Sequence, residues 1–246
     1  PFVLAPNLSK ILKNKNKIIS KRQRAHNDGV FFNFHSPEAF DEVFFSFCKK
    51  NIENELKMYI SLILYSKSKK KYLSKNNFKY LNLELLKNTF PNSFFIIPFR
   101  NPSDQANSLL KLHKHFLVLH KNDNFVKKYM SYLGHYEFGE IHKPWNTPIK
   151  FFDTLNINYW LEQWYLFYKN IEKKFNKNGN FILFPYDSLN DEKLLNIISR
   201  KAEIKNNLKF SYINSENNYS LNQIDNVLLN SSNILYNNLK KICCNV

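Results

Sequence analysis

Residues 94–110 read FFIIPFRNPSDQANSLL and carry the clearest indication of the fold in the sequence. Its first six residues, Phe94–Phe99, are continuously apolar, which is typical of a strand buried on both faces of a parallel sheet. The pair Asn101-Pro102 then turns the chain, and helical periodicity follows over Ser103–Leu119. The stretch therefore predicts a buried strand that passes through a tight turn into a helix.

Arg100 occupies the turn between this strand and this helix, at the carboxyl edge of the predicted sheet. Ligands of open parallel sheets bind at that edge. The first N–H groups of a helix carry partial positive charge, and a guanidinium matches the oxygens of a phosphate. Ser108 follows eight residues after Arg100, so its hydroxyl can face the same anion. We therefore expect a phosphate site, the alternative being an arginine paired with an acid and a serine that faces solvent.

Short apolar runs and longer periodic segments alternate along the rest of the chain. We expect strands at Tyr72–Ser74 and Phe181–Phe184. Helices are predicted over 36–47, 51–67, 78–89, 124–133, 157–174, 190–200 and 224–243. Strands that alternate with helices indicate an α/β fold, namely a three-layer parallel sheet with helices on both faces. No long linker divides the sequence, so we expect one domain over residues 1–246.

Aromatic residues at helical spacing predict which faces of two helices are buried. In the helix that starts near residue 36, a buried face is expected at Phe40, Val43, Phe44 and Phe47. In the helix over 157–174, Trp160 and Trp164 lie one helical turn apart, so we expect them in the core rather than at a sugar-binding surface.

The chain has 246 residues, 43% of them hydrophobic, and a formal net charge of +16. Such a positive field attracts nucleic acid, anionic membranes and phosphorylated cofactors. The lysine runs at 13–17 and 67–71 lack the arginine and glycine interleaving of nucleic-acid arms, and no zinc-finger or RNA-recognition signature is present. We therefore expect no nucleic-acid partner.

The three cysteines, Cys48, Cys243 and Cys244, form neither a disulfide framework nor a metal-binding pattern. A reducing compartment is the simpler interpretation, so we expect a cytoplasmic protein. No apolar run reaches the roughly 18 residues that a transmembrane helix needs. The sequence thus predicts a protein without a membrane span.

Residues 100–108, RNPSDQANS, resemble the 3′-phosphate-binding motif of sulfotransferases that use 3′-phosphoadenosine 5′-phosphosulfate. In that motif an arginine ends a strand, a proline follows, and a serine comes eight residues after the arginine. Further similar stretches lie in family order: RAHNDGVFFNFHSPEAFDEVFF (24–45), the region 72–116, FVKKYMSYLGHYEFG (125–139), INYWLEQWYLFY (157–168) and FPYDSL (184–189). Together they make the chain similar to bacterial members of this family over roughly residues 1–200.

The resemblance implies a P-loop-like three-layer α/β fold and transfer of a sulfuryl group from this donor to a hydroxyl or an amine. Carried over by motif, Arg100 and Ser108 would hold the 3′-phosphate, and Tyr186-Asp187 would fix a loop near the sheet edge. Asn101 stands where the family more commonly has aspartate, which should matter little because the arginine and the serine make the phosphate contacts. We expect a small molecule, a glycan or a peptide as acceptor, and no metal.

These enzymes grip the 5′-phosphosulfate of the donor with a loop rich in Gly, Ser and Thr that follows the first strand near the N-terminus. Residues 1–246 hold no such segment, and the sequence begins with Pro1 rather than Met. We therefore expect an N-terminally truncated form that lacks the first strand and the 5′-phosphosulfate half of the donor site.

Sulfuryl transfer needs a base for the acceptor proton and positive charge at the leaving phosphate oxygen. His26 is the leading base because it lies in a loop beside Asp28, which can fix its tautomer. The alternative is a histidine on a surface loop. Lys75, at the end of the predicted strand 72–74, is expected to neutralise the leaving oxygen or to contact the acceptor. The alternative is one more solvated lysine. Substrate contacts are expected from Asp28, Glu38 and Asn76.

The remaining histidines give weaker signals. His113 and His115 are spaced wrongly for one helical face, so a metal pair is not expected, and we interpret them with His120 as surface residues or as the rim of the acceptor site. His135 and His142 flank a segment with glycine and proline that is expected to close over substrate.

Three functions are open at this point. The first is sulfuryl transfer. The second is a related P-loop-like phosphotransferase or nucleotide-binding protein, which would carry a Gly-x-x-x-x-Gly-Lys-Ser/Thr loop. The third is a non-catalytic module that binds 3′-phosphates or other polyanions. Binding of adenosine 3′,5′-bisphosphate that depends on Arg100 would support the motif on which the first interpretation is based.

Overall fold

The computed structural model describes residues 22–24, 26, 31–32, 41–48, 50–68, 70–75, 82–175, 180–204 and 223–243. The chain divides into two compact units. The first comprises Pro1–Pro91 with Lys128–His135, and the second comprises Asn92–Lys127 with Tyr136–Val246. The expectation of one domain over residues 1–246 stays a prediction.

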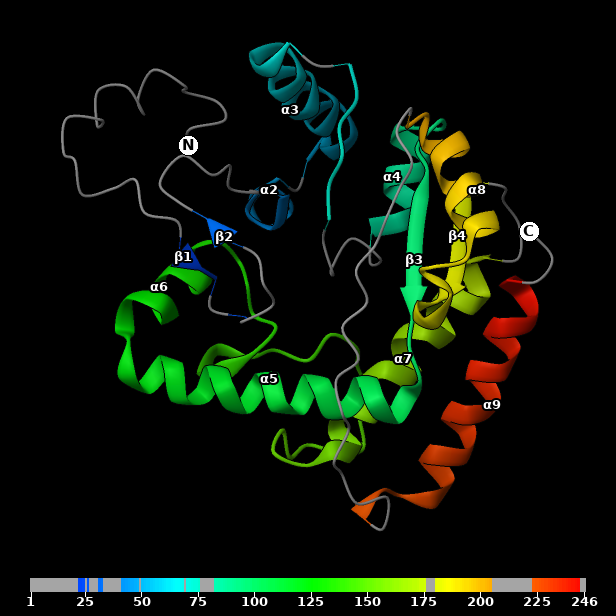
Figure 1. Ribbon diagram of the computed structural model, residues 1–246. Helices are drawn as coiled ribbons and strands as arrows, with labels where there is room; N and C mark the ends of the chain where they lie inside the picture. Colours follow the sequence, from blue (N-terminus) through cyan, green and yellow to red (C-terminus); the bar gives the residue numbers. More distant parts are fainter. Residues whose placement is uncertain are drawn as a thin grey trace. The chain divides into compact units, whose positions relative to one another are not determined.

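The described residues of the first unit include a short antiparallel ladder and several helices (Figure 1). Strand β1 (Arg22–Gln23) pairs with β2 (Phe31–Phe32). The helices are α2 (Asp41–Phe47), α3 (Ile52–Lys67) and α4 (Leu83–Thr89). Helix α3 confirms the prediction over 51–67. Helices α2 and α4 confirm the later parts of two predicted helices, whose first residues, 36–40 and 78–81, lie outside the described residues.

Asp41, the first residue of α2, is buried and organises the segment around residue 73. The hydroxyl of Tyr72 donates a hydrogen bond of 2.8 Å to its carboxylate, and the hydroxyl of Ser74 donates to its other oxygen. Alternate side chains of an extended segment point the same way, so Leu73 between them is 93% exposed. The predicted strand at Tyr72–Ser74 is therefore wrong, because this segment is held by side chains rather than by a backbone ladder.

The prediction of a buried face on α2 is only partly right. Val43 and Phe44 are partly buried, and the ring of Phe44 stacks on Tyr59 of α3 with centroids 5.1 Å apart. Phe47, however, is 83% exposed. With Asp41 buried, a residue six positions later points about 120° away around the helix, which explains the exposure of Phe47.

The second unit is built on two parallel strands, β3 (Phe95–Phe99) and β4 (Phe181–Pro185), which lie side by side in Figure 1. Both predicted strands are confirmed. Among the described residues, the second unit also contains α5 (Pro102–Asn122), the 3-10 turn η3 (Gly139–Ile141), α7 (Ile157–Phe175), the 3-10 turn η4 (Tyr186–Ser188), α8 (Glu192–Ala202) and α9 (Asn226–Cys243). Helix α6 (Asn124–Tyr132) begins in the second unit, and its residues from Lys128 on belong to the first unit. This is an α/β arrangement whose parallel sheet has two strands in the described part of the chain.

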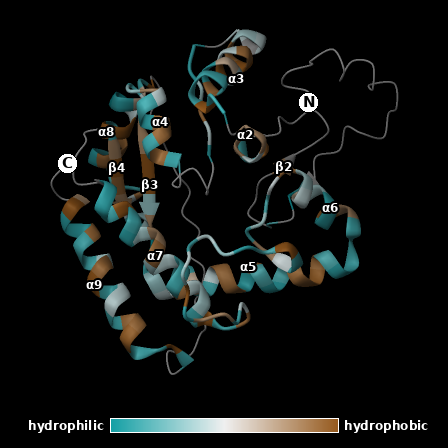
Figure 2. Ribbon diagram, turned by 180° about the vertical axis from the view of Figure 1, so that it is seen from behind, coloured by the Kyte–Doolittle hydropathy of each residue, from teal (hydrophilic) through white to brown (hydrophobic). Residues whose placement is uncertain are grey.

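Helices lie on both faces of this sheet. Phe99 contacts Tyr168 of α7 and Tyr236 of α9, with ring centroids 6.2 and 5.6 Å apart. On the other face, Ile182 and Phe184 form a core cluster with Ile198 of α8. Figure 2 shows β3 and β4 as mostly hydrophobic and α9 as a mixture of apolar and polar residues, as expected for a helix with one buried face.

The two strands differ in burial. Residues Phe181–Phe184 of β4 are all buried, whereas in β3 only Phe99 is, and Ile96 is 41% exposed. The prediction that β3 is buried on both faces is therefore wrong. The helix α8 that covers β4 leaves the alternate residues of β3 uncovered, and Pro98 at one of them is a residue that favours sheet edges because it lacks an N–H.

Helix α7 anchors the loop that precedes it. Gln163 accepts hydrogen bonds from the backbone of Trp145 and Asn146, and Glu162 accepts hydrogen bonds from the backbone of Lys150 and Phe151. Trp160 and Trp164 of the same helix are fully buried, which confirms their predicted place in the core. Across the described ranges of the chain, no helix combines the length and apolar character needed to cross a bilayer.

The packing of α9 on α7 and β4 makes a test of the fold. Replacing the fully buried Leu239 by alanine leaves a cavity, so we expect Leu239→Ala to lower the free energy of unfolding by about 3 kcal/mol. Ile234→Ala, on the exposed side of the same helix, should change it by less than about 0.5 kcal/mol. Urea unfolding followed by circular dichroism measures both, and equal midpoints for the two variants would contradict this packing.

Candidate functional site

Arg100 and Tyr186 leave the sheet together. The last paired residues of the two strands are Phe99 and Pro185, so the residue after each emerges at the same edge. The guanidinium carbon of Arg100 lies 5.3 Å from the centroid of the Tyr186 ring, within the range of a cation–π contact. This contact places the arginine head group at the carboxyl edge of β3 and β4, where the sequence predicted it.

The Arg100 side chain is half-buried, yet it makes no hydrogen bond or ion pair in the described part of the chain. A guanidinium has five N–H donors. The alternative prediction is that a neighbouring acid neutralises this arginine. Among the described residues, no acid forms an ion pair with Arg100. The partly buried Ser108 likewise has no hydrogen-bond partner for its hydroxyl among them.

The start of α5 is capped by its own side chain. The Asn101 side-chain oxygen accepts hydrogen bonds from the backbone N–H of Ser103 at 3.0 Å and of Asp104 at 3.2 Å. Pro102, the first helical residue, has no N–H to offer. The prediction that open N–H groups of this turn help to bind the anion is therefore wrong for these positions, since a capping asparagine satisfies them first.

Tyr168 lies behind Arg100 and holds the end of β3. Its hydroxyl donates a hydrogen bond of 2.9 Å to the carbonyl of Pro98. Burial raises the pKa of Tyr168, opposed by a hydrogen bond from the side chain of Gln105 and by the charge of Arg100, so the phenol is neutral near pH 7. This contact could not be predicted from the sequence, because it joins α7 to a strand about 70 residues earlier in the chain.

Two amide side chains near the start of α5 have unused polar atoms. The side-chain oxygen of Gln105 and the side-chain nitrogen of Asn107 are buried without a hydrogen-bond partner in the region that the structure describes. Buried polar groups are normally paired with protein, water or ligand. Both atoms lie in the first two turns of α5, the helix that also carries Ser108.

The structure describes two of the other predicted site residues. His26, partly buried on a turn, and Lys75, exposed and outside any strand, belong to the first unit, and both already interact with other groups. The prediction that Lys75 lies at the end of a strand is wrong, because residues 72–74 do not form a strand. The predicted substrate residues Asp28, Glu38 and Asn76 lie outside the described residues.

Two of the three histidines on α5 are buried, contrary to the prediction that they lie on the surface. His113 is 1% exposed and His120 is 3% exposed, whereas His115 is exposed as predicted. His113 and His120 continue the apolar face of the helix at a spacing of two turns, a signal that the sequence carried.

Closure over substrate by the segment between His135 and His142 stays a prediction, and the structure shows His142 held by neighbouring groups. One ring nitrogen contacts the hydroxyl of Tyr159 and the other lies 3.2 Å from the carbonyl oxygen of Tyr136. Its ring also packs on Trp160 with centroids 5.0 Å apart.

Comparisons with protein-family models, with curated proteins and with solved structures find no match for this chain. The resemblance to sulfotransferases over roughly residues 1–200 therefore stays a prediction from the sequence motifs. The evidence for a function therefore consists of the contacts and charges around Arg100.

The cap on α5 can be tested separately from any ligand. We expect Asn101→Ala to lower the free energy of unfolding by about 1 kcal/mol, because two backbone N–H groups lose their acceptor. Asn101→Asp keeps an oxygen at the same place and adds a charge that favours a helix start, so its stability should match or exceed the original. Urea unfolding of the three proteins measures this, and a stable alanine variant would show that the cap contributes nothing.

Proposed function

We propose that this chain is a sulfotransferase domain that transfers a sulfuryl group from 3′-phosphoadenosine 5′-phosphosulfate to a hydroxyl or an amine. The observation that carries the proposal is the half-buried Arg100 head group, which ends a parallel strand and has no hydrogen bond or ion pair within the described residues. The sequence from Arg100 to Ser108 is similar to the family's 3′-phosphate motif, which gives this positive charge a specific ligand.

The 3′-phosphate is assigned to Arg100 and Ser108. A guanidinium binds two oxygens of a phosphate at once, and a serine hydroxyl donates one further bond. Ser108 comes seven residues after the cap Asn101, which is close to two full helical turns, so the two residues lie on the same side of α5. The capped helix start leaves these side chains, rather than backbone N–H groups, as the donors.

The parallel pair of β3 and β4, with α8 on one face and α7 and α9 on the other, is compatible with a three-layer P-loop-like fold. The larger sheet of that fold is part of the proposal. We assign no residue of this chain to the 5′-phosphosulfate half of the donor site.

In the proposed reaction, an oxygen or nitrogen of the acceptor attacks the sulfur of the donor and forms a new bond to it. The bond from sulfur to the 5′-phosphate oxygen breaks, and adenosine 3′,5′-bisphosphate leaves. His26 is proposed to take the acceptor proton, and Lys75 to neutralise the leaving oxygen. Asp28, Glu38 and Asn76 are proposed to contact an acceptor that is a small molecule, a glycan or a peptide.

Binding is the first test, and we expect adenosine 3′,5′-bisphosphate to bind in isothermal titration calorimetry. Arg100→Ala should weaken this binding by roughly 10- to 100-fold, the value of one or two charge-assisted hydrogen bonds. Arg200→Ala, an exposed arginine on α8, is the matched control and should leave the affinity unchanged. Adenosine 5′-monophosphate, which lacks the 3′-phosphate, should lose much less with Arg100→Ala. Equal affinities for Arg100→Ala and the original protein would contradict the assignment.

Transfer is the second test, because the same donors at Arg100 would also serve a non-catalytic nucleotide-binding protein. Donor labelled with ³⁵S, incubated with alcohol, phenol, amine and glycan acceptors, should give a labelled product. We expect His26→Asn to lower its rate by roughly 100-fold or more if this imidazole is the base, with bisphosphate binding retained. Binding that depends on Arg100 without any transfer would favour the non-catalytic alternative.

A further inference from the structure

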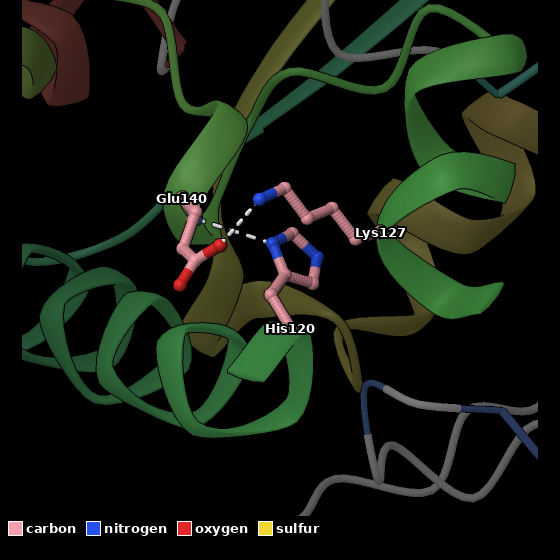
Figure 3. A network of polar contacts seen from close by, with 3 residues as sticks. All are labelled: His120, Lys127 and Glu140. Carbon is pink, nitrogen blue, oxygen red and sulfur yellow. Dashed lines mark hydrogen bonds and ion pairs between the residues drawn. The ribbon is translucent and has the colours of Figure 1, made fainter. Parts of the chain in front are cut away.

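Two buried histidines of α5 hold the turn η3 by its backbone. The N–H of Gly139 donates to Nδ1 of His113 at 3.2 Å, and the N–H of the next residue, Glu140, donates to Nδ1 of His120 at 3.1 Å. Figure 3 shows the second of these contacts, with Lys127 beside it. The two histidines lie two helical turns apart, so one face of α5 presents two acceptors to consecutive N–H groups.

Both contacts require neutral imidazoles. A ring nitrogen accepts a hydrogen bond only while it carries no proton, so the hydrogen of each ring sits on Nε2. For His113 this places an N–H 3.1 Å from the hydroxyl oxygen of Thr154, where it can donate. Protonation of Nδ1 would set N–H against N–H and break the contact with the turn.

The turn also lies tightly against the second ring. Gly139 has a φ of +76°, and a Cβ built there would come within 2.4 Å of two ring atoms of His120. The ion pair between Lys127 and Glu140, at 2.6 Å, is partly exposed and therefore contributes little. The imidazole contacts thus form a buried polar link between α5 and this turn.

Burial and the neighbouring charged groups shift the pKa values of both histidines. Burial, His142 and His120 together lower the pKa of His113 to about 4. Burial also lowers the pKa of His120, with Lys127 acting in the same direction and the carboxylate of Glu140 opposing it. The pKa of His142 is lowered as well, mainly by burial. All three imidazoles are therefore neutral near pH 7.

We propose that His113 and His120 form a pH-sensitive latch, in which protonation of the two rings releases the turn Gly139–Ile141 from α5. The latched state binds fewer protons than the released state, whose histidines have an ordinary pKa near 6.5. A fall in pH from 7.5 to 5 therefore favours release, by about 30-fold from His113 alone. The latch does not depend on the proposed function.

A single amide reports on the latch. The sequence has four glycines, and Gly139 is the one preceded by phenylalanine. Labelling with ¹³C-carbonyl phenylalanine and ¹⁵N-glycine therefore identifies its N–H in the NMR spectrum. We expect its protection from exchange with water, corrected for the intrinsic effect of pH, to fall by about 30-fold or more between pH 7.5 and 5. Unchanged protection over this range would overturn the proposal.

Variants separate the latch from general acid sensitivity. Asparagine places an oxygen at about the position of Nδ1 and does not titrate, so the double variant His113→Asn/His120→Asn should change its Gly139 protection by less than about twofold. If the double variant does not fold, each single variant should remove part of the response. His115→Asn, at the exposed histidine of the same helix, should respond like the original protein. An undiminished response in the folded asparagine variants, or loss of the helical circular dichroism signal in step with Gly139 exchange, would overturn the latch.

Discussion

Phe99 of β3 pairs with Pro185 of β4, and this register makes Arg100 and Tyr186 emerge from the sheet side by side. The rest of the candidate site follows from that pairing. Tyr168 fixes the end of β3 through the carbonyl of Pro98, and α5 starts two residues after Arg100, with the capping Asn101 between them. A shift of one residue in the register would separate the guanidinium from the aromatic ring beside it. The backbone of two strands thus positions a charge that no acid in the described part of the chain neutralises.

Side chains of α5 and α7 fix the segment of the chain that lies between α6 and α7. Glu162 and Gln163 of α7 accept backbone N–H groups from residues 145–151, and two histidines of α5 accept those of η3. Buried backbone N–H groups need acceptors, and a segment without strand partners obtains them from side chains. The amide oxygen of Gln163 accepts a hydrogen bond at any pH, whereas the imidazoles of His113 and His120 accept only when they are neutral.

The regular elements of the second unit could be predicted from periodicity. Pro102 marks the start of α5 to within one residue, because proline suits the first helical position, and the strands at 95–99 and 181–185 follow from their apolar runs. What could not be predicted depends on contacts between distant segments. The sequence of Tyr72–Ser74 predicts a strand, and only the structure shows that both hydroxyls bind the buried carboxylate of Asp41 instead. Within the site, Arg100 could be found from its motif, whereas the ring of Tyr186 beside it and the cap by Asn101 required the structure.

Pro98 has a consequence for the way in which β3 of the folded chain can pair with other strands. Proline has no N–H, so β3 has no hydrogen-bond donor at this position. The carbonyl of Pro98 already accepts a hydrogen bond from Tyr168. The open edges of strands are the usual templates on which copies of a protein associate into aggregates. A strand from another copy could not extend a continuous ladder along β3 past Pro98, so this residue protects an apolar strand from association.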